Sequence, residues 1–108
     1  MRRGDFVTIA MQGDFGKPRP ALVIQTDHFN QHPSVTVLPV TGTLVAAPLL
    51  RITVHGDQAS GLTKTSQVMV DKAITVKRDK VGPPIGRIRA DALLEVERCL
   101  AVFLGITK

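Results

Sequence analysis

The sequence contains no tryptophan and no tyrosine, and four phenylalanines are its only aromatic residues of the stacking kind. Nucleic-acid-binding sheets of the RRM or OB kind stack bases on exposed aromatic side chains. A non-catalytic SH3-like module that captures peptides needs an aromatic groove for a similar reason. The composition therefore disfavours both a base-stacking platform and an aromatic peptide groove.

Cysteine is nearly absent, since Cys99 is the only one. No disulfide can form within the chain, which fits a reducing compartment, and we expect a cytoplasmic protein. Cys99 falls within an apolar helical pattern. We therefore interpret it as a small buried apolar residue and not as a reactive thiol.

Long apolar runs are also missing, since the longest, such as Val45–Leu50, have four to six residues. A membrane-spanning helix needs about 20 apolar residues. The basic start, Met1–Asp5, lacks the apolar run of a signal peptide. We expect no association with a membrane.

Metal-binding and cofactor-binding patterns are absent from the sequence. His28, His32 and His55 share no ligand spacing with one another or with Cys99, and a surface loop is the favoured interpretation for the first two. The sequence has no phosphate-binding loop, no dinucleotide fingerprint and no nucleophile elbow. We expect neither a metal ion nor a cofactor.

What the chain does have is basic charge. Fourteen lysines and arginines against nine acidic residues give a formal net charge of +5, which favours a polyanionic partner, although a generic solubility charge is the alternative. Apolar residues make up 44% of the chain, enough for a core. At 108 residues the sequence predicts a single domain, 1–108.

Short β-like runs follow one another along most of the chain. They predict strands at the following positions: Phe6–Ala10, Pro20–Thr26, Val35–Val40, Leu50–Val54, Val68–Val76 and Ile85–Ile88. Glycine and proline predict a loop at Gln12–Pro18 and a turn at Val81–Pro84. Asp71 and Lys72 interrupt the Val68–Val76 run, so we expect a break there.

The last part of the chain, Ala90–Leu104, has helical spacing. One apolar stripe is formed by Leu93, Val96, Leu100, Phe103 and Leu104. Asp91 favours the helix N-terminus, and Gly105 stands where a helix C-cap would. The pattern predicts a mainly β (α+β) fold, a small, strongly bent sheet or barrel with a terminal helix packed against it.

Arg19 is the first candidate for chemistry. It stands between Pro18 and Pro20, which fix the backbone where a loop enters a strand. A guanidinium on such a mount suits bidentate contact with phosphate. A surface arginine at the mouth of a strand fits equally well on these residues alone.

Thr41 and Asp71 are further candidates. Thr41 follows Leu38-Pro39-Val40 and precedes Gly42, so its hydroxyl could bind a phosphate oxygen or cap the turn. Asp71 could lie in a cleft or on the solvent face of its strand. Taken alone, the residue types favour the turn cap and the solvent face.

Six segments, in order along nearly the whole chain, resemble the MazF/PemK family of toxins. They are Arg3-Gly4-Asp5-Phe6-Val7, Pro18-Arg19-Pro20-Ala21-Leu22-Val23-Ile24, Asp27-His28-Phe29-Asn30, Val37-Leu38-Pro39-Val40-Thr41, Ser66-Gln67-Val68-Met69-Val70-Asp71, and Ile85-Gly86-Arg87-Ile88 with the helix to Leu104-Gly105-Ile106.

The resemblance implies a small SH3-like, partly open β-barrel with a C-terminal helix, and a homodimer. It implies the toxin of a type II toxin–antitoxin system that inhibits growth and is held in check by a small acidic antitoxin. The implied activity is ribosome-independent, sequence-preferring and metal-independent cleavage of single-stranded RNA, through attack of a ribose 2′-hydroxyl. Messenger RNA is the first expected substrate, with ribosomal or transfer RNA as alternatives.

The resemblance also assigns roles to residues. It implies Arg19 and Thr41 as the catalytic arginine and hydroxyl, and Asp71 as the acidic catalytic position. Gln12, Lys17 and Lys72 are the expected RNA-binding residues. The chain departs from the family pattern at Lys72, where members often have glutamine, and at Met69, where some have arginine.

A different class of toxin remains as an alternative. CcdB-like gyrase poisons resemble this fold, bind a protein and cleave nothing. They lack the Pro-Arg-Pro-Ala-Leu-Val and Pro-x-Thr segments that this chain has at 18–23 and 39–41.

Overall fold

The computed structural model describes residues 1–10 and 17–107. The strands in these ranges are β1 (Asp5–Ile9), β2 (Arg19–Val23), β3 (Ser34–Thr41), β4 (Arg51–Val54), β5 (Ser66–Met69), β6 (Ile74–Lys77) and β7 (Val81–Arg87). Short 3₁₀ turns are η1 (Asp27–Phe29), η2 (Val70–Lys72) and η3 (Arg78–Lys80), and the α-helix is α1 (Ala90–Phe103).

In the described residues, seven antiparallel strands form one sheet, ordered β4-β5-β3-β2-β1-β7, with β6 also on β3. The long strand β3 organises this sheet. One edge of β3 pairs with β2, while β6 and β5 pair along the other edge, β6 with its first half and β5 with its last two residues. The turn η2 separates β5 from β6, so the break expected near Asp71 and Lys72 is present.

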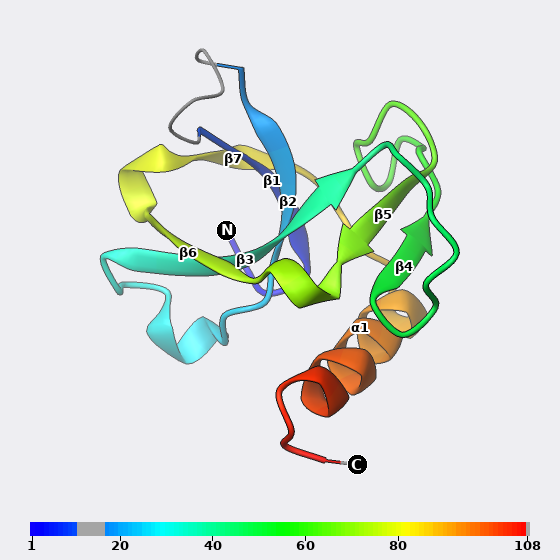
Figure 1. The fold of residues 1–108 in the computed structure, drawn as a ribbon. Helices are drawn as coiled ribbons and strands as arrows, with labels where there is room; N and C mark the ends of the chain where they lie inside the picture. Colours follow the sequence, from blue (N-terminus) through cyan, green and yellow to red (C-terminus); the bar gives the residue numbers. More distant parts are fainter. Residues whose placement is uncertain (11–16, 108) are drawn as a thin grey trace.

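The sheet curls into an incomplete barrel. Figure 1 shows β2, β3, β6, β7 and β1 curving around a common interior, with α1 outside this ring beside β4. Across the described residues, no ladder joins β6 to β7, so the ring stays open there. The expected SH3-like, partly open barrel with a C-terminal helix is confirmed.

Two apolar clusters fill the two faces of the curved sheet. The cluster inside the ring consists of Val7, Ile9, Ala21, Val23, Val35 and Val37. The larger cluster packs under α1 and β4 and includes Phe6, Leu22, Leu38, Ile52, Val68 and Val96. Side chains alternate between faces along a strand, so β1 and β2 supply both clusters. Burial on both faces explains why residues 21–23 form a continuous apolar run.

The turn expected at Val81–Pro84 is wrong, because these residues begin β7. In the described residues β7 pairs with β1 alone, so it is an edge strand. An edge strand tolerates proline, whose missing N–H would otherwise break a ladder. Register shifts interrupt the pairing of β7 with β1 on both sides of Val7, opposite Pro84.

The helix begins and ends as the sequence predicts, to within one residue. Gly105 has φ +74°, and the N–H groups of Gly105 and Ile106 donate to the carbonyls of Val102 and Ala101, which is a Schellman cap. Val96 and Cys99 are buried, and burial followed by the nearby Glu95 carboxylate raises the pKa of the Cys99 thiol. No helix in the described part of the chain has the length and apolar character to cross a membrane.

The expectation of a single packed stripe fails at the last turn of α1. Leu93 and Leu100 pack against the larger cluster, but Phe103 and Leu104 are 49% and 57% exposed. The sheet does not extend under this turn, since β4 and η2 are the elements that α1 contacts most. The C-terminal end of the helix therefore presents an uncovered apolar surface.

Candidate functional site

An open groove of about 700 Å³ lies where β3 ends and β2 begins. Its described lining residues are Thr8, Arg19, Pro20, Pro39, Val40, Thr41, Gly42, Thr43, Gly61, Leu62, Thr63, Lys64, Ser66, Met69 and Ile85. Two of these residues are cations and none of them carries a carboxylate or an imidazole. The lining therefore offers positive charge, hydroxyl groups and apolar surface, which suits a phosphate-bearing ligand.

Strand pairing brings Arg19 and Thr41 together. The β2–β3 ladder pairs Val23 with Val37 and Ala21 with Pro39. The same register, continued by two residues, places Arg19 opposite Thr41. Both residues line the groove, Arg19 with an exposed side chain and Thr41 half-buried. The two residues that the resemblance singles out thus meet through a ladder that neither segment reveals alone.

The Thr41 hydroxyl also has a local role. Its Oγ1 accepts a hydrogen bond of 3.1 Å from the backbone N–H of Thr43, as a turn-capping residue would. A hydroxyl that accepts a bond still has its own proton to donate. Capping and ligand binding are therefore compatible at Thr41, because the backbone bond orients the oxygen and leaves the proton for a ligand.

A rigid wall borders the groove on the side of residues 56–64. Gly61 has φ +74°, and any Cβ on Gly61 or Gly86 would overlap the backbone of the facing segment, so this segment packs directly on β7. Ser60 is buried, and its hydroxyl donates to the carbonyl of His55 over 2.9 Å. Leu62 anchors the same segment in the larger apolar cluster. This side of the groove is therefore held in place by close packing against β7 and the core.

Asp71 lies outside the groove, on η2, where its carboxylate accepts a hydrogen bond from and forms an ion pair with Arg51 of β4. Burial acts to raise the pKa of Asp71, but the Arg51 hydrogen bond and the charges of Arg51 and Lys72 outweigh it, and the pKa is lowered from 3.8. A carboxylate held in this way is a weak base. The structure brings Arg19 and Thr41 together but does not bring Asp71 to them.

The expected RNA-binding residues lie in different parts of the molecule. Lys17 is exposed just before β2, two residues from Arg19, and Lys72 is exposed on η2 beside Asp71. Neither lines the groove. Gln12 lies outside the described residues. The hydroxyls of Thr8, Thr43 and Thr63 also line the groove, and sequence inspection did not single them out because nothing in their local pattern marks them.

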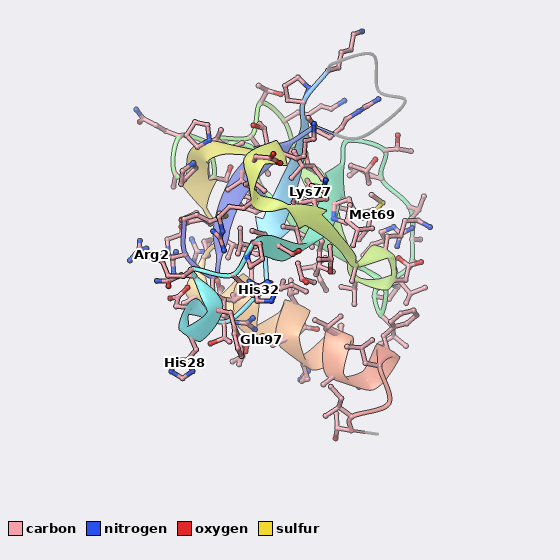
Figure 2. All side chains as sticks on the ribbon, turned by 90° about the vertical axis from the view of Figure 1, so that its left-hand side faces the viewer. Arg2, His28, His32, Met69, Lys77 and Glu97 are labelled. Carbon is pink, nitrogen blue, oxygen red and sulfur yellow. The ribbon has the colours of Figure 1, made fainter. Side chains whose placement is uncertain are left out.

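Two of the three histidines, His28 and His32, belong to the segment around η1. His28 and His32 leave this segment in different directions (Figure 2), and the rings of His32 and Phe29 meet edge to face with centroids 6.4 Å apart. The described residues contain no group of three or more histidine, cysteine or acidic side chains placed to hold a metal ion. His28 lies within η1 and His32 in the bend that follows it, and both are exposed.

A second cavity, of about 610 Å³, lies between β4 and the start of α1. Its floor is apolar and includes Phe6 and Ile52, while its rim mixes Arg87 and Arg89 with the carboxyl groups of Asp57, Asp91 and Glu95. Acidic groups on a rim repel a phosphate backbone. The groove at Arg19 is therefore the better candidate for a polyanion, although the two cavities are similar in size.

Comparison with known proteins gives a consistent result. A family model described as PemK-like, MazF-like toxin of type II toxin–antitoxin system matches residues 2–104. The chain is 46% identical over 107 residues to a protein of Mycolicibacterium smegmatis named probable endoribonuclease MazF, with 98% of each chain covered. The matches support the interpretation of the chain as a MazF-like endoribonuclease toxin and give no support to the alternative of a gyrase poison.

Solved structures share the fold. A mycobacterial endoribonuclease in complex with its cognate antitoxin has a TM-score of 0.81 at 21% identity, covering 100% of this chain and 98% of that one. A MazE–MazF complex from Deinococcus radiodurans has a TM-score of 0.81 at 23% identity, covering 99% and 97%. The family model spans nearly the whole chain and the curated relative covers 98% of it, so this chain belongs to the PemK-like, MazF-like toxins of type II toxin–antitoxin systems.

Proposed function

We propose that this chain is the toxin of a type II toxin–antitoxin pair and that it cleaves single-stranded RNA as a sequence-preferring endoribonuclease. The observation that carries the proposal is the meeting of Arg19 and Thr41 in an open groove whose described lining has cations and hydroxyls but no carboxylate. Family membership and the 46% identical relative, named probable endoribonuclease MazF, support the same activity. The messenger RNA of the cytoplasm is the substrate we propose first.

The proposed reaction is an internal transesterification. The ribose 2′-oxygen forms a bond to the adjacent phosphorus, the bond from phosphorus to the 5′-oxygen breaks, and the 2′-proton leaves while the 5′-oxygen gains one. The products are a 2′,3′-cyclic phosphate and a 5′-hydroxyl. Since the RNA supplies its own nucleophile, the protein has to position the phosphate and stabilise the charge that develops on it.

Arg19 and Thr41 fit these two tasks. The Arg19 guanidinium would bind the non-bridging oxygens as they gain negative charge, and the two flanking prolines limit how far its backbone can move. The Thr41 hydroxyl would donate one hydrogen bond to the same phosphate. No step in this scheme needs a metal ion, so we propose metal-independent cleavage.

For Asp71 we propose a positioning role. The resemblance assigns it to catalysis, but its carboxylate is engaged with Arg51 on η2. This turn directly follows Met69, which lines the groove. The Arg51–Asp71 pair would hold the end of β5, and through it this side of the groove, in place.

The contacts to flanking RNA remain proposals for Lys17, Lys72 and Gln12. Lys17 is exposed close to Arg19, so we expect it to contribute most among the described ones. Lys72 stands farther along, on η2. Both would act as point charges toward phosphates, without reading base identity.

A small acidic antitoxin is the proposed protein partner. The structural neighbours include complexes of a toxin with its antitoxin. A flexible acidic segment would be complementary to Arg19 and Lys64 and would order on binding in the groove, so it would compete with RNA. Titration of such a peptide against a labelled RNA tests this, and simultaneous binding of both would overturn the competition.

We also propose that the protein is a homodimer. The end of α1 exposes Phe103 and Leu104, and a cavity of about 210 Å³ lies between Val102, Phe103 and Leu49. An apolar patch of this kind on a soluble chain marks an association surface. The test is light scattering of the protein as it elutes from a size-exclusion column. Phe103→Glu should give a monomer. Leu94→Glu should keep the dimer, because Leu94 is exposed on the same helix but lies outside this cavity.

The test of the activity is cleavage of a long RNA by the purified protein with excess EDTA. We expect cutting at a limited set of sites, with 2′,3′-cyclic phosphate and 5′-hydroxyl ends on the fragments. Fragments with 5′-phosphate ends, or loss of cutting in EDTA, would contradict the mechanism. Arg19→Ala in the same assay excludes a contaminating nuclease, because that variant should not cut.

A further inference from the structure

Lys64 is the second cation of the groove, and the proposed cleavage reaction assigns it no role. It lines the groove together with Arg19 and Thr41, and its side chain is exposed. Among the described residues, no carboxylate forms an ion pair with its ammonium group. A lysine whose charge is not neutralised by the protein can bind an anion without first breaking an internal pair.

The sheet order places Arg19 and Lys64 on opposite sides of Thr41. Strand β3 has β2 on one edge and β5 on the other. Arg19 is the first residue of β2, and Lys64 comes two residues before β5, whose Gln67 pairs with Thr41. The Thr41 hydroxyl at the end of β3 therefore has a cation on each side, Arg19 from β2 and Lys64 from the segment that leads into β5.

Gly42 allows the Lys64 side chain to lie where it does. A Cβ built on Gly42 would fall 2.7 Å from the Lys64 Nζ, and closer still to its Cε. The end of the lysine thus lies directly against the backbone that follows Thr41. Any side chain at position 42 would displace the ammonium group, although the flexible end of a lysine can move aside without disturbing the fold.

The backbone that carries Lys64 is held firmly. Gly56 packs so closely on the backbone of residue 64 that a Cβ there would overlap it, and Ser66, the first residue of β5, donates its hydroxyl to the Lys64 carbonyl over 2.9 Å. Leu62 is buried in the core nearby. The entropic cost of placing the ammonium is therefore confined to one side chain, because the main chain is already fixed.

We propose that Lys64 binds the RNA phosphate next to the scissile one, so that the groove holds two successive phosphates. Gly42 positions the Lys64 ammonium group, because its lack of a side chain lets the lysine lie against the backbone. This inference rests on the proposed nuclease function and extends it to the footprint on the substrate. Arg19 and Thr41 act where charge develops during the reaction. Lys64 acts on a phosphate whose charge does not change, so it contributes equally to binding before and during the reaction.

The experiment measures binding and cleavage separately. The binding probe is a fluorescent, mixed-sequence RNA with 2′-O-methyl groups, which lacks the attacking hydroxyl and stays intact. Its affinity is measured by anisotropy over a range of salt concentrations for the wild type, Lys64→Gln, Gly42→Ala and the double variant. Lys77→Gln is the matched control, since it removes the same charge from Lys77, which pairs with Ser34 at the far end of β3.

We expect Lys64→Gln to weaken binding about fivefold and to reduce the slope of log affinity against log salt by about 0.7, the value for one phosphate contact in single-stranded nucleic acid. On a short RNA that spans a mapped cleavage site, KM should rise while kcat stays unchanged. Gly42→Ala should reproduce much of this loss with the charge retained. In the double variant the two losses should not add, because both act on one contact.

The possible outcomes separate the two proposals. If the wild type cleaves RNA and Lys64→Gln behaves like Lys77→Gln, the role of Lys64 is wrong and the nuclease assignment stands. Additive losses of affinity for Gly42→Ala and Lys64→Gln would overturn the proposal that Gly42 positions the Lys64 ammonium group. A fall in kcat for Lys64→Gln would place the lysine on the scissile phosphate instead of its neighbour. A wild type that neither binds nor cleaves RNA overturns both proposals.

Discussion

Two arginines occupy the same position in their strands and have opposite surroundings. Arg19 is the first residue of β2 and Arg51 is the first residue of β4. Arg19 is exposed in an open groove, while the Arg51 side chain is only 14% exposed and is paired with Asp71. The comparison teaches that an arginine at the start of a strand can bind a ligand where the fold leaves its guanidinium exposed in a groove, and serves as a structural ion pair where the fold buries it.

The flanking residues already suggest the difference. Prolines flank Arg19, whereas Leu50 and Ile52 flank Arg51. Apolar neighbours draw the Arg51 backbone into the core, where its guanidinium also donates to the Leu50 carbonyl over 3.1 Å. A charge taken out of water in this way needs a partner, and Asp71 supplies it.

The strongest test of this comparison exchanges each arginine for alanine. Arg19→Ala should lower kcat/KM for RNA about a thousandfold, because a group that stabilises charge in the transition state is lost. Its fold should be unchanged, since the side chain is exposed. Arg51→Ala should lower the midpoint of urea unfolding and reduce cleavage by about tenfold at most. Equal losses of activity in two well-folded variants would remove the distinction.

Thr41→Val should have the next largest effect. The substitution keeps the shape and removes the hydroxyl, so the phosphate loses one hydrogen bond and the turn loses its cap at Thr43. Cleavage should fall about tenfold to a hundredfold. Thr41→Ser keeps the hydroxyl and should retain most activity, which single-turnover kinetics of the two variants would show. A Thr41→Ser variant as poor as Thr41→Val would mean that the methyl group matters and the hydroxyl does not.

Asp71→Asn should affect stability more than cleavage. The lowered pKa means that the folded state favours the ionised carboxylate, so its contribution is present above the unfolded value of about 3.8 and is lost as the pH falls through the lower folded value. The difference in unfolding free energy between wild type and variant should therefore be constant near neutrality and vanish in acid. Urea titrations at several pH values check this, and a difference that grows on acidification would have the wrong sign.

The smallest effects should come from the outlying lysines. Lys17→Gln should weaken RNA binding about threefold and reduce its salt dependence, since Lys17 is two residues from Arg19. Lys72→Gln, on η2 beyond the groove, should change binding by less than about twofold. Anisotropy with the 2′-O-methyl RNA measures both. A larger effect at Lys72 would mean that the RNA path runs across η2.

Local patterns were enough to predict much of the fold. The spacing of apolar residues predicted α1, and its glycine cap is present at Gly105. Charged residues inside a β-branched run predicted the interruption between β5 and β6. These features depend on residues that are close in the sequence, so short-range physics determines them. The pairing of Val81–Pro84 with β1 escaped prediction because it depends on which strand lies at the edge of the sheet.

The candidate site shows the same difference between features set by local sequence and features set by long-range strand pairing. Arg19 and Thr41 could be named from the sequence by resemblance, but their meeting depends on the β2–β3 register. The partner of Asp71 is Arg51, twenty residues away, and only the pairing of β4 with β5 brings the two side chains together. Lys64 was one basic residue among several until the sheet order placed it beside Gly42. Long-range pairing therefore decided which charges act together.

The prolines of β7 have a consequence for how copies of this protein can assemble. An open sheet edge is a template on which further strands can be added without limit. Pro83 and Pro84 are exposed on this edge and offer no N–H groups, so a continuous ladder cannot form there. The exposed end of α1, by contrast, is a compact patch that two copies can cover completely. The edge at β7 thus discourages open-ended strand addition, whereas the end of α1 suits the closed pairing proposed for two copies.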